Sequence, residues 1–195
     1  NWVANQRSRG IVVDLLCGNH ELAYLSGRMD ICSGTRFSAM HDLASLLNKA
    51  DIKLATTVDG YLCAHAGLTV RWADWVFPEA HEAVRNADEW ADLLNEWFDR
   101  SSRSVVTKLA SAGPARGGWC DPSVVWADAN ELLMDCEPDL PQIVGHTPVE
   151  TVTHVGVEGR DLWFCDTWSN HTDGTPIGDH SFLLVEDGTF SVIGG

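Results

Sequence analysis

The chain has 195 residues, of which 45% are hydrophobic, a length and apolar content that suit one folded domain and exclude general disorder. Its 13 basic and 28 acidic residues give a formal net charge of −15, which excludes a basic surface for nucleic acid. No apolar run reaches the length of a membrane span, and the first residues carry no signal pattern. We therefore expect a cytoplasmic protein with neither a nucleic-acid nor a membrane partner.

The first part of the chain alternates strand-like and helix-like segments. Residues 11–17 form an apolar run that predicts a buried strand, and residues 40–50 predict a helix. Residues 51–64 predict a hairpin that turns at an Asp-Gly pair. Over residues 79–100 the apolar positions recur at spacings of three and four, which predicts a single amphipathic helix.

The second part begins with a loop and continues as a series of short strands. Residues 111–122 are rich in Gly and Pro, which indicates a loop. The segments that read as strands after it are 142–144, 151–155, 162–165, 181–185 and 190–193. Helix and strand alternation followed by strands predicts an α/β fold, a two-sheet β-sandwich flanked by helices, with the functional site at one end.

Three of the apolar runs end at a small-residue turn that carries a polar side chain. The turns are Gly18-Asn19-His20-Glu21, His65-Ala66-Gly67 and Gly145-His146-Thr147-Pro148. Open α/β folds bind ligands at the carboxyl edge of the sheet, so we expect these turns to share one mouth. Imidazole nitrogen and amide oxygen both bind divalent metals, so Asn19, His65 and His146 indicate half of a mixed nitrogen and oxygen metal site.

The three turns, in this order, resemble the motifs of the calcineurin-like metallophosphoesterases. They are most similar to the phosphoprotein phosphatase branch, which includes Ser/Thr phosphatases and diadenosine tetraphosphatase-like enzymes. The resemblance implies metal-dependent hydrolysis of phosphate esters by in-line attack of a metal-bound hydroxide. It further implies two divalent metal ions, manganese or iron with zinc, and a catalytic role for His20 as the acid that protonates the leaving alcohol. The substrate would be a phosphorylated protein, a dinucleotide or a small molecule.

The sequence departs from this family at its N-terminal end. The family's first two motifs, Gly-Asp-x-His and Gly-Asp-x-x-Asp-Arg-Gly, are absent. We therefore expect residues 1–195 to be one calcineurin-like phosphoesterase domain that lacks its N-terminal part, holds at most one metal ion and is inactive alone. The alternative is a non-catalytic binding module with the phosphoesterase fold and without the first metal site.

A few other polar residues are weaker candidates. Trp126-Ala127-Asp128 resembles a string that lies near the active site of the phosphatases, which suggests a role for Asp128 behind the site. Arg116, in the Gly-rich loop, has the chemistry to clamp a phosphate or contact substrate. For both residues a solvated loop position is the competing interpretation. Asp166 and His171 are candidates for the rim of the pocket, and His154 is expected to be structural or at the surface.

Overall fold

The computed structural model describes residues 2–28, 32, 34–157 and 159–194. Its helices are α1 (Trp2–Ser8), α2 (Asn19–Ser26), α3 (Met40–Asn48), α4 (Val70–Val76), α5 (Ala80–Ala83), α6 (Ala87–Trp97), α7 (Arg103–Leu109) and α8 (Ala129–Asp135), with 3-10 turns η1 (Phe37–Ala39) and η2 (Pro114–Arg116). Its strands are β1 (Leu15–Leu16), β2 (Ile52–Lys53), β3 (Ala55–Val58), β4 (Tyr61–Ala64), β5 (Gln142–Pro148), β6 (Thr153–Val157), β7 (Arg160–Asp166), β8 (Phe182–Glu186) and β9 (Thr189–Ile193).

The centre of the molecule is a mixed five-stranded sheet in the order β3-β4-β5-β7-β6. Strands β4, β5 and β7 run parallel, and β3 and β6 pair antiparallel at the two edges. The short strands β1 and β2 form a separate parallel pair, and β8 and β9 form a hairpin. Because β4, β5 and β7 are parallel, their carboxyl ends lie along one edge of the sheet.

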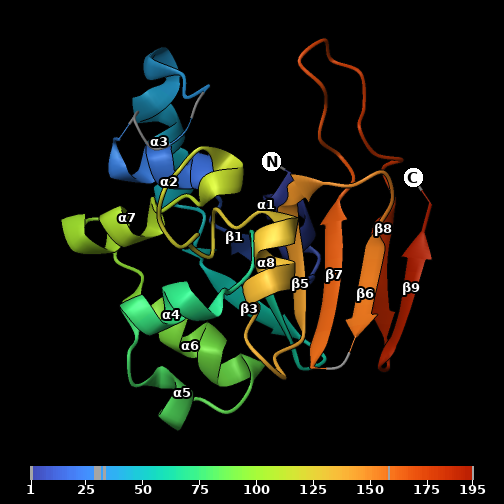
Figure 1. The fold of residues 1–195 in the computed structure, drawn as a ribbon. Helices are drawn as coiled ribbons and strands as arrows, with labels where there is room; N and C mark the ends of the chain where they lie inside the picture. Colours follow the sequence, from blue (N-terminus) through green and yellow to red (C-terminus); the bar gives the residue numbers. More distant parts are fainter. Residues whose placement is uncertain (1, 29–31, 33, 158, 195) are drawn as a thin grey trace.

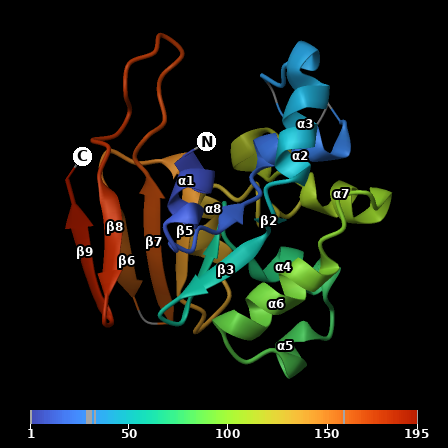
Figure 2. The same ribbon diagram turned by 180° about the vertical axis from the view of Figure 1, so that it is seen from behind.

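The helices and the later strands occupy different sides of the molecule. Figure 1 shows α2 to α7 on one side and β6, β8 and β9 on the other, with α8 lying against β5. Figure 2, from behind, shows α1 and the β1–β2 pair on the opposite face from α8. The larger apolar core follows the helical side and is centred on residues such as Leu54, Trp72 and Leu94, whereas a smaller cluster around Leu132 packs α8 onto the sheet. No helix in the described parts of the chain is long and apolar enough to cross a membrane.

The helix expected over residues 79–100 is broken in two. Val84 leaves the helical region with ψ of 133°, and Asn86 starts α6 as its N-cap by accepting a hydrogen bond from the Glu89 N–H. An Asn side chain competes with helical backbone bonds and favours such a start, even where the apolar spacing is helical throughout. The prediction of one continuous helix was therefore wrong, although α6 buries Ala87, Trp90 and Leu94 of the expected apolar face.

The other predicted elements differ less from the structure. The helix expected over residues 40–50 is α3, and the hairpin is β3 and β4, whose turn holds Asp59 and Gly60 at φ of 47° and 81°. Two positive φ angles in a row suit the right-handed twist of a tight hairpin. Of the strand expected over residues 11–17, only β1 forms.

The expected α/β class is confirmed, since a mixed sheet is flanked by helices. The two-sheet sandwich is not seen: the described strands form one five-stranded sheet and two separate pairs. The strand pattern could not distinguish these arrangements, because each strand has a similar length and alternation in both.

Candidate active site

The strand ends bring the three predicted turns together. Asn19 and His20 begin α2 directly after β1, His65 follows β4, and His146 lies near the end of β5. Asp166 ends the neighbouring strand β7. The expectation of one shared mouth at the carboxyl edge is met by these residues, which line a single cavity of about 590 Å³.

The start of α2 is shaped by a glycine. Gly18 is the N-cap, and its N–H donates to the Glu21 carboxylate at 3.1 Å, which ties the turn to the first turn of the helix. A Cβ at Gly18 would lie 2.7 Å from Cε1 of the His65 ring. Only glycine therefore lets the β1–α2 turn approach His65 this closely.

Asn19, His65 and His146 form a hydrogen-bonded chain. His65 Nε2 lies 3.1 Å from Asn19 Oδ1 and 3.0 Å from His146 Nδ1. Because an amide oxygen only accepts, the proton is assigned to His65 Nε2, and His146 Nδ1 then accepts. Neutral His146 consequently carries its own proton on Nε2.

His146 is held in an unusual backbone conformation. Its φ is 63°, in the left-handed region, and the pairing of β5 with β7 is irregular between Val144 and Pro148. A left-handed histidine costs conformational free energy of about 1 to 3 kcal/mol. The irregularity re-aims the His146 ring toward His65, a geometry that a regular strand would not give.

Both rings are kept neutral at pH 7. Burial, and next the nearby charges of His65, Arg116 and His20, lowers the pKa of His146 to about 3. Burial also lowers the pKa of His65, although Glu21 and Asp166 oppose that shift. A neutral imidazole donates through one nitrogen and accepts through the other, so neither ring adds charge to the cavity.

Arg116 brings a positive charge to this cavity from the Gly-rich loop. Its Nη2 donates to Thr147 Oγ1 at 3.0 Å and forms an ion pair with Asp128 Oδ2 at 3.2 Å. Asp128 is itself the N-cap of α8 and accepts from the Asn130 N–H. Asp128 thus lies behind Arg116 and orients its guanidinium.

Three residues that line the cavity each carry a buried nitrogen without a hydrogen-bond partner: Arg116 Nε, Trp126 Nε1 and His146 Nε2. With the proton assignment above, all three are N–H donors. Buried donors are rarely left unpaired, since each lost hydrogen bond costs about 1 to 3 kcal/mol. A cavity lined by a guanidinium, and by residues whose buried donors lack a protein partner, suits a ligand with negatively charged oxygens, although the carboxylate of Asp166 lines it too.

His20 lines the same cavity from the first turn of α2. Its Nε2 lies 3.3 Å from the Cys32 Sγ, and burial followed by the charge of Glu21 raises the pKa of this thiol. Asp166 also lines the cavity and accepts from the Ser169 hydroxyl at 2.8 Å. Sequence reasoning did not find Cys32, which follows no strand, or Ser169, which follows β7 but belongs to no recognisable motif.

The known proteins that this chain resembles are found among solved structures. No family model matches the chain, and no curated protein matches it. A cold-active protein tyrosine phosphatase of a psychrophile Shewanella sp. matches with a TM-score of 0.50 and 16% identity, over 97% of this chain and 58% of that one. A point mutant of a cold-active protein tyrosine phosphatase matches with a TM-score of 0.51 and 14% identity, over the same shares. The chain thus spans 58% of the length of these neighbours, with which it shares a fold.

The neighbours overturn the family expected from the motifs. The chain was expected to be a calcineurin-like metallophosphoesterase, but the solved structures it matches are protein tyrosine phosphatases, and no family model supports the expected assignment. Short motifs at strand ends report where a ligand site lies in an α/β fold, and that information is shared by unrelated families.

The expectation of two divalent metal ions, which followed from that family, is not supported either. Manganese, or iron with zinc, was expected at Asn19, His65 and His146. The described residues contain no group of three or more His, Cys, Asp or Glu that could hold a metal ion. The three side chains do lie together, as two imidazoles joined to each other by a hydrogen bond and one amide, so they contribute only two members to a group that needs three.

Proposed function

We propose that this chain hydrolyses phosphate monoesters, with a phosphorylated protein side chain as the substrate. The observation that carries the proposal is the set of unpaired N–H donors on Arg116, Trp126 and His146 around one cavity. A phosphate group has enough oxygens to accept from all three, and its charge matches the guanidinium. The likeness in fold to protein tyrosine phosphatases supports the same reaction class.

In the proposed reaction His20 protonates the leaving oxygen. It begins α2 beside the donor set, with its ring against the cavity. An alkyl alkoxide is a poor leaving group, so a proton delivered as the phosphorus–oxygen bond breaks accelerates the reaction by about 10² to 10⁴-fold. His20 is therefore the residue with the largest expected share of the chemistry.

Water is the attacking group that we propose. The thiol of Cys32 lies in the cavity, but burial raises its pKa, which disfavours the nucleophilic thiolate. Asp166 is the carboxylate among the described residues that line the cavity, and it takes the proton of the attacking water. The products are then inorganic phosphate and the neutral alcohol, without a covalent enzyme intermediate.

The alternative of a non-catalytic binding module is not favoured. A binding site needs the donor set but not a histidine at the leaving-group side, and here His20 lines the cavity that holds the donors. A binding module would retain phosphate affinity and show no turnover, so the two proposals differ in a measurable way.

The test is turnover of an aryl phosphate and of a tyrosine-phosphorylated peptide by the purified chain, with and without a chelator. Arg116→Met should lower kcat/KM at least about 10²-fold, because a charge-assisted pair to the phosphate is lost. Arg103→Met, at an exposed arginine on α7, is the matched control and should not differ from the native chain. No turnover of any phosphate monoester, or equal activity of the two variants, would refute the proposal.

A further inference from the structure

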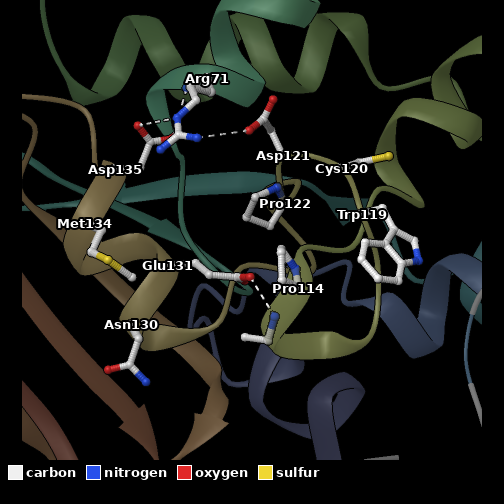
Figure 3. Close-up of a pocket in the computed structure, with 11 residues that line it drawn as sticks. Arg71, Pro114, Trp119, Cys120, Asp121, Pro122, Asn130, Glu131, Met134 and Asp135 are labelled. Atoms are coloured by element: carbon white, nitrogen blue, oxygen red, sulfur yellow. Dashed lines mark hydrogen bonds and ion pairs between the residues drawn. The ribbon is translucent and has the colours of Figure 1, made fainter.

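A second cavity lies on the other side of the loop that carries Arg116. It measures about 520 Å³ and lies between residues 113–122 and α8, as Figure 3 shows. Ala115, the neighbour of Arg116 in sequence, is among its lining residues. We refer to this cavity as the loop groove. The loop groove and the candidate active site therefore share the loop of residues 113–122 as a wall.

The loop groove is acidic. Asp121, Glu131 and Asp135 line it, against a single guanidinium from Arg71. Arg71 lies between two of these carboxylates, 3.7 Å from Asp121 and 3.4 Å from Asp135, as Figure 3 shows. Three carboxylates and one cation leave net negative charge, which attracts a cationic group and repels an anionic one.

The loop groove also exposes large apolar side chains. Trp119 is 95% exposed and Met134 is 71% exposed, and both line the groove. Figure 3 shows the two side chains on opposite walls. Tryptophan dominates many binding hot spots, and methionine adapts its shape to different apolar partners. Two such side chains across one acidic groove suit a ligand that carries both an apolar group and a positive charge.

The groove wall is fastened to the site by one carboxylate. Glu131 Oε1 accepts from the Ala115 N–H at 2.9 Å, and Glu131 Oε2 accepts from the Asp128 N–H at 3.0 Å. Gly113 packs so closely on Glu131 that a Cβ there would overlap the carboxylate. The loop therefore presents Arg116 to the site and its other residues to the groove in one fixed arrangement.

From this geometry we infer that the loop groove binds the polypeptide beside the phosphorylated residue of a protein substrate and selects an apolar residue next to a Lys or Arg. The inference rests on the proposed function. A dinucleoside polyphosphate, also consistent with the sequence, is the disfavoured occupant because its phosphates would face Asp121, Glu131 and Asp135. The acidic surface of the whole chain, with its charge of −15, adds to this preference.

The test uses two phosphopeptides with the same phosphorylated residue, one flanked by Lys and Leu and the other by Glu and Ser. The native chain should prefer the first by about tenfold in kcat/KM. Trp119→Ala should remove most of this preference by raising KM for the Lys–Leu peptide. The readout is the ratio of kcat/KM for the peptide to kcat/KM for an aryl phosphate. Trp2→Ala, at a tryptophan that is 68% exposed on α1, is the matched control and should keep the native ratio. Asp121→Asn should reduce the preference for Lys over Glu.

Peptide binding is also measured without turnover, by fluorescence anisotropy with phosphonate analogues of both peptides. Weaker binding of the Lys–Leu analogue by Trp119→Ala supports the loop groove even if no substrate is hydrolysed, an outcome that defeats only the proposed function. Equal binding of both analogues, or equal effects of Trp119→Ala and Trp2→Ala, overturns the inference. Displacement of the analogue by a dinucleoside polyphosphate in a Trp119-dependent manner also overturns it.

Discussion

Two histidines of the same sheet, His146 and His154, occupy opposite kinds of environment. His146 near the end of β5 is mostly buried, has a left-handed backbone and carries a nitrogen without a partner. His154 on β6 is partly exposed, donates from Nε2 to the Asp161 carboxylate at 2.8 Å, and stacks on Trp163 at 4.3 Å between ring centroids.

The contrast separates a site from a structural pair. His154 and Asp161 satisfy each other, and Asp161 also accepts from the Tyr61 hydroxyl at 2.7 Å, so these three side chains pair among themselves, whereas Nε1 of the stacked Trp163 is buried without a partner. Burial, and next the bond to Asp161, raises the pKa of Tyr61 to about 12. His146 instead combines backbone strain, burial and a missing partner, three costs that persist where a ligand is expected.

The largest expected effect tests whether the cavity around His146 is catalytic. His20→Ala should lower kcat/KM for an alkyl phosphate by about 10² to 10⁴-fold, and much less for an aryl phosphate whose leaving group needs little protonation. Initial rates on both substrates are the measurement, and His154→Ala is the control that should leave both unchanged. Equal losses on the two substrates would show that His20 does not act as the acid.

A smaller effect is expected from removing one donor of the set. Trp126→Phe keeps the aromatic ring but removes the N–H, so kcat/KM for phosphate monoesters should fall by about 10- to 100-fold, as for one lost hydrogen bond to a charged group. Trp163→Phe makes the same change in the His154 cluster and should have no effect on turnover. If the two variants behave alike, Trp126 does not bind the phosphate.

Stability should distinguish two glycines on either side of His65. Gly18→Ala should reduce the free energy of unfolding by roughly 1 to 3 kcal/mol, because its Cβ would overlap the His65 ring. At Gly145→Ala the added Cβ would meet the His65 carbonyl oxygen at 3.5 Å, an ordinary contact, so a change within about 0.5 kcal/mol is expected. Urea denaturation measures both, and equal destabilisation would contradict the close approach described here.

Stability should also depend on pH through His146. Because burial lowers the pKa of His146 from 6.5 to about 3, the unfolded chain binds a proton there that the folded chain does not. The contribution of His146 to stability is thus complete above pH 6.5 and is lost as the pH falls toward 3, by roughly 1 kcal/mol per pH unit. The free energy of unfolding of His146→Asn should therefore fall less between pH 6.5 and 4.5 than that of the native chain. Parallel curves for native and variant chains would mean that His146 titrates normally.

The sequence predicted that Asn19, His65 and His146 lie together, and the structure brings them to one cavity, because the end of a buried strand is a local property that the sheet then assembles. It could not predict the left-handed His146, the donor on Trp126 or the position of Cys32, which depend on contacts between distant segments. The break at Val84 was missed for a local reason, because the cap at Asn86 outweighs a helical apolar spacing.

The carboxylate of Glu131 joins the walls of the two cavities. One side chain fixes the backbone at Ala115, beside the loop groove, and at Asp128, which orients Arg116. A displacement of the backbone at Ala115 would therefore be transmitted to Asp128 through two hydrogen bonds to the same carboxylate. If both proposals hold, phosphate and the flanking peptide should bind with a non-zero coupling free energy. In a double-mutant cycle of Trp119 and Arg116, the effects on peptide binding should not add, and Glu131→Gln should restore additivity.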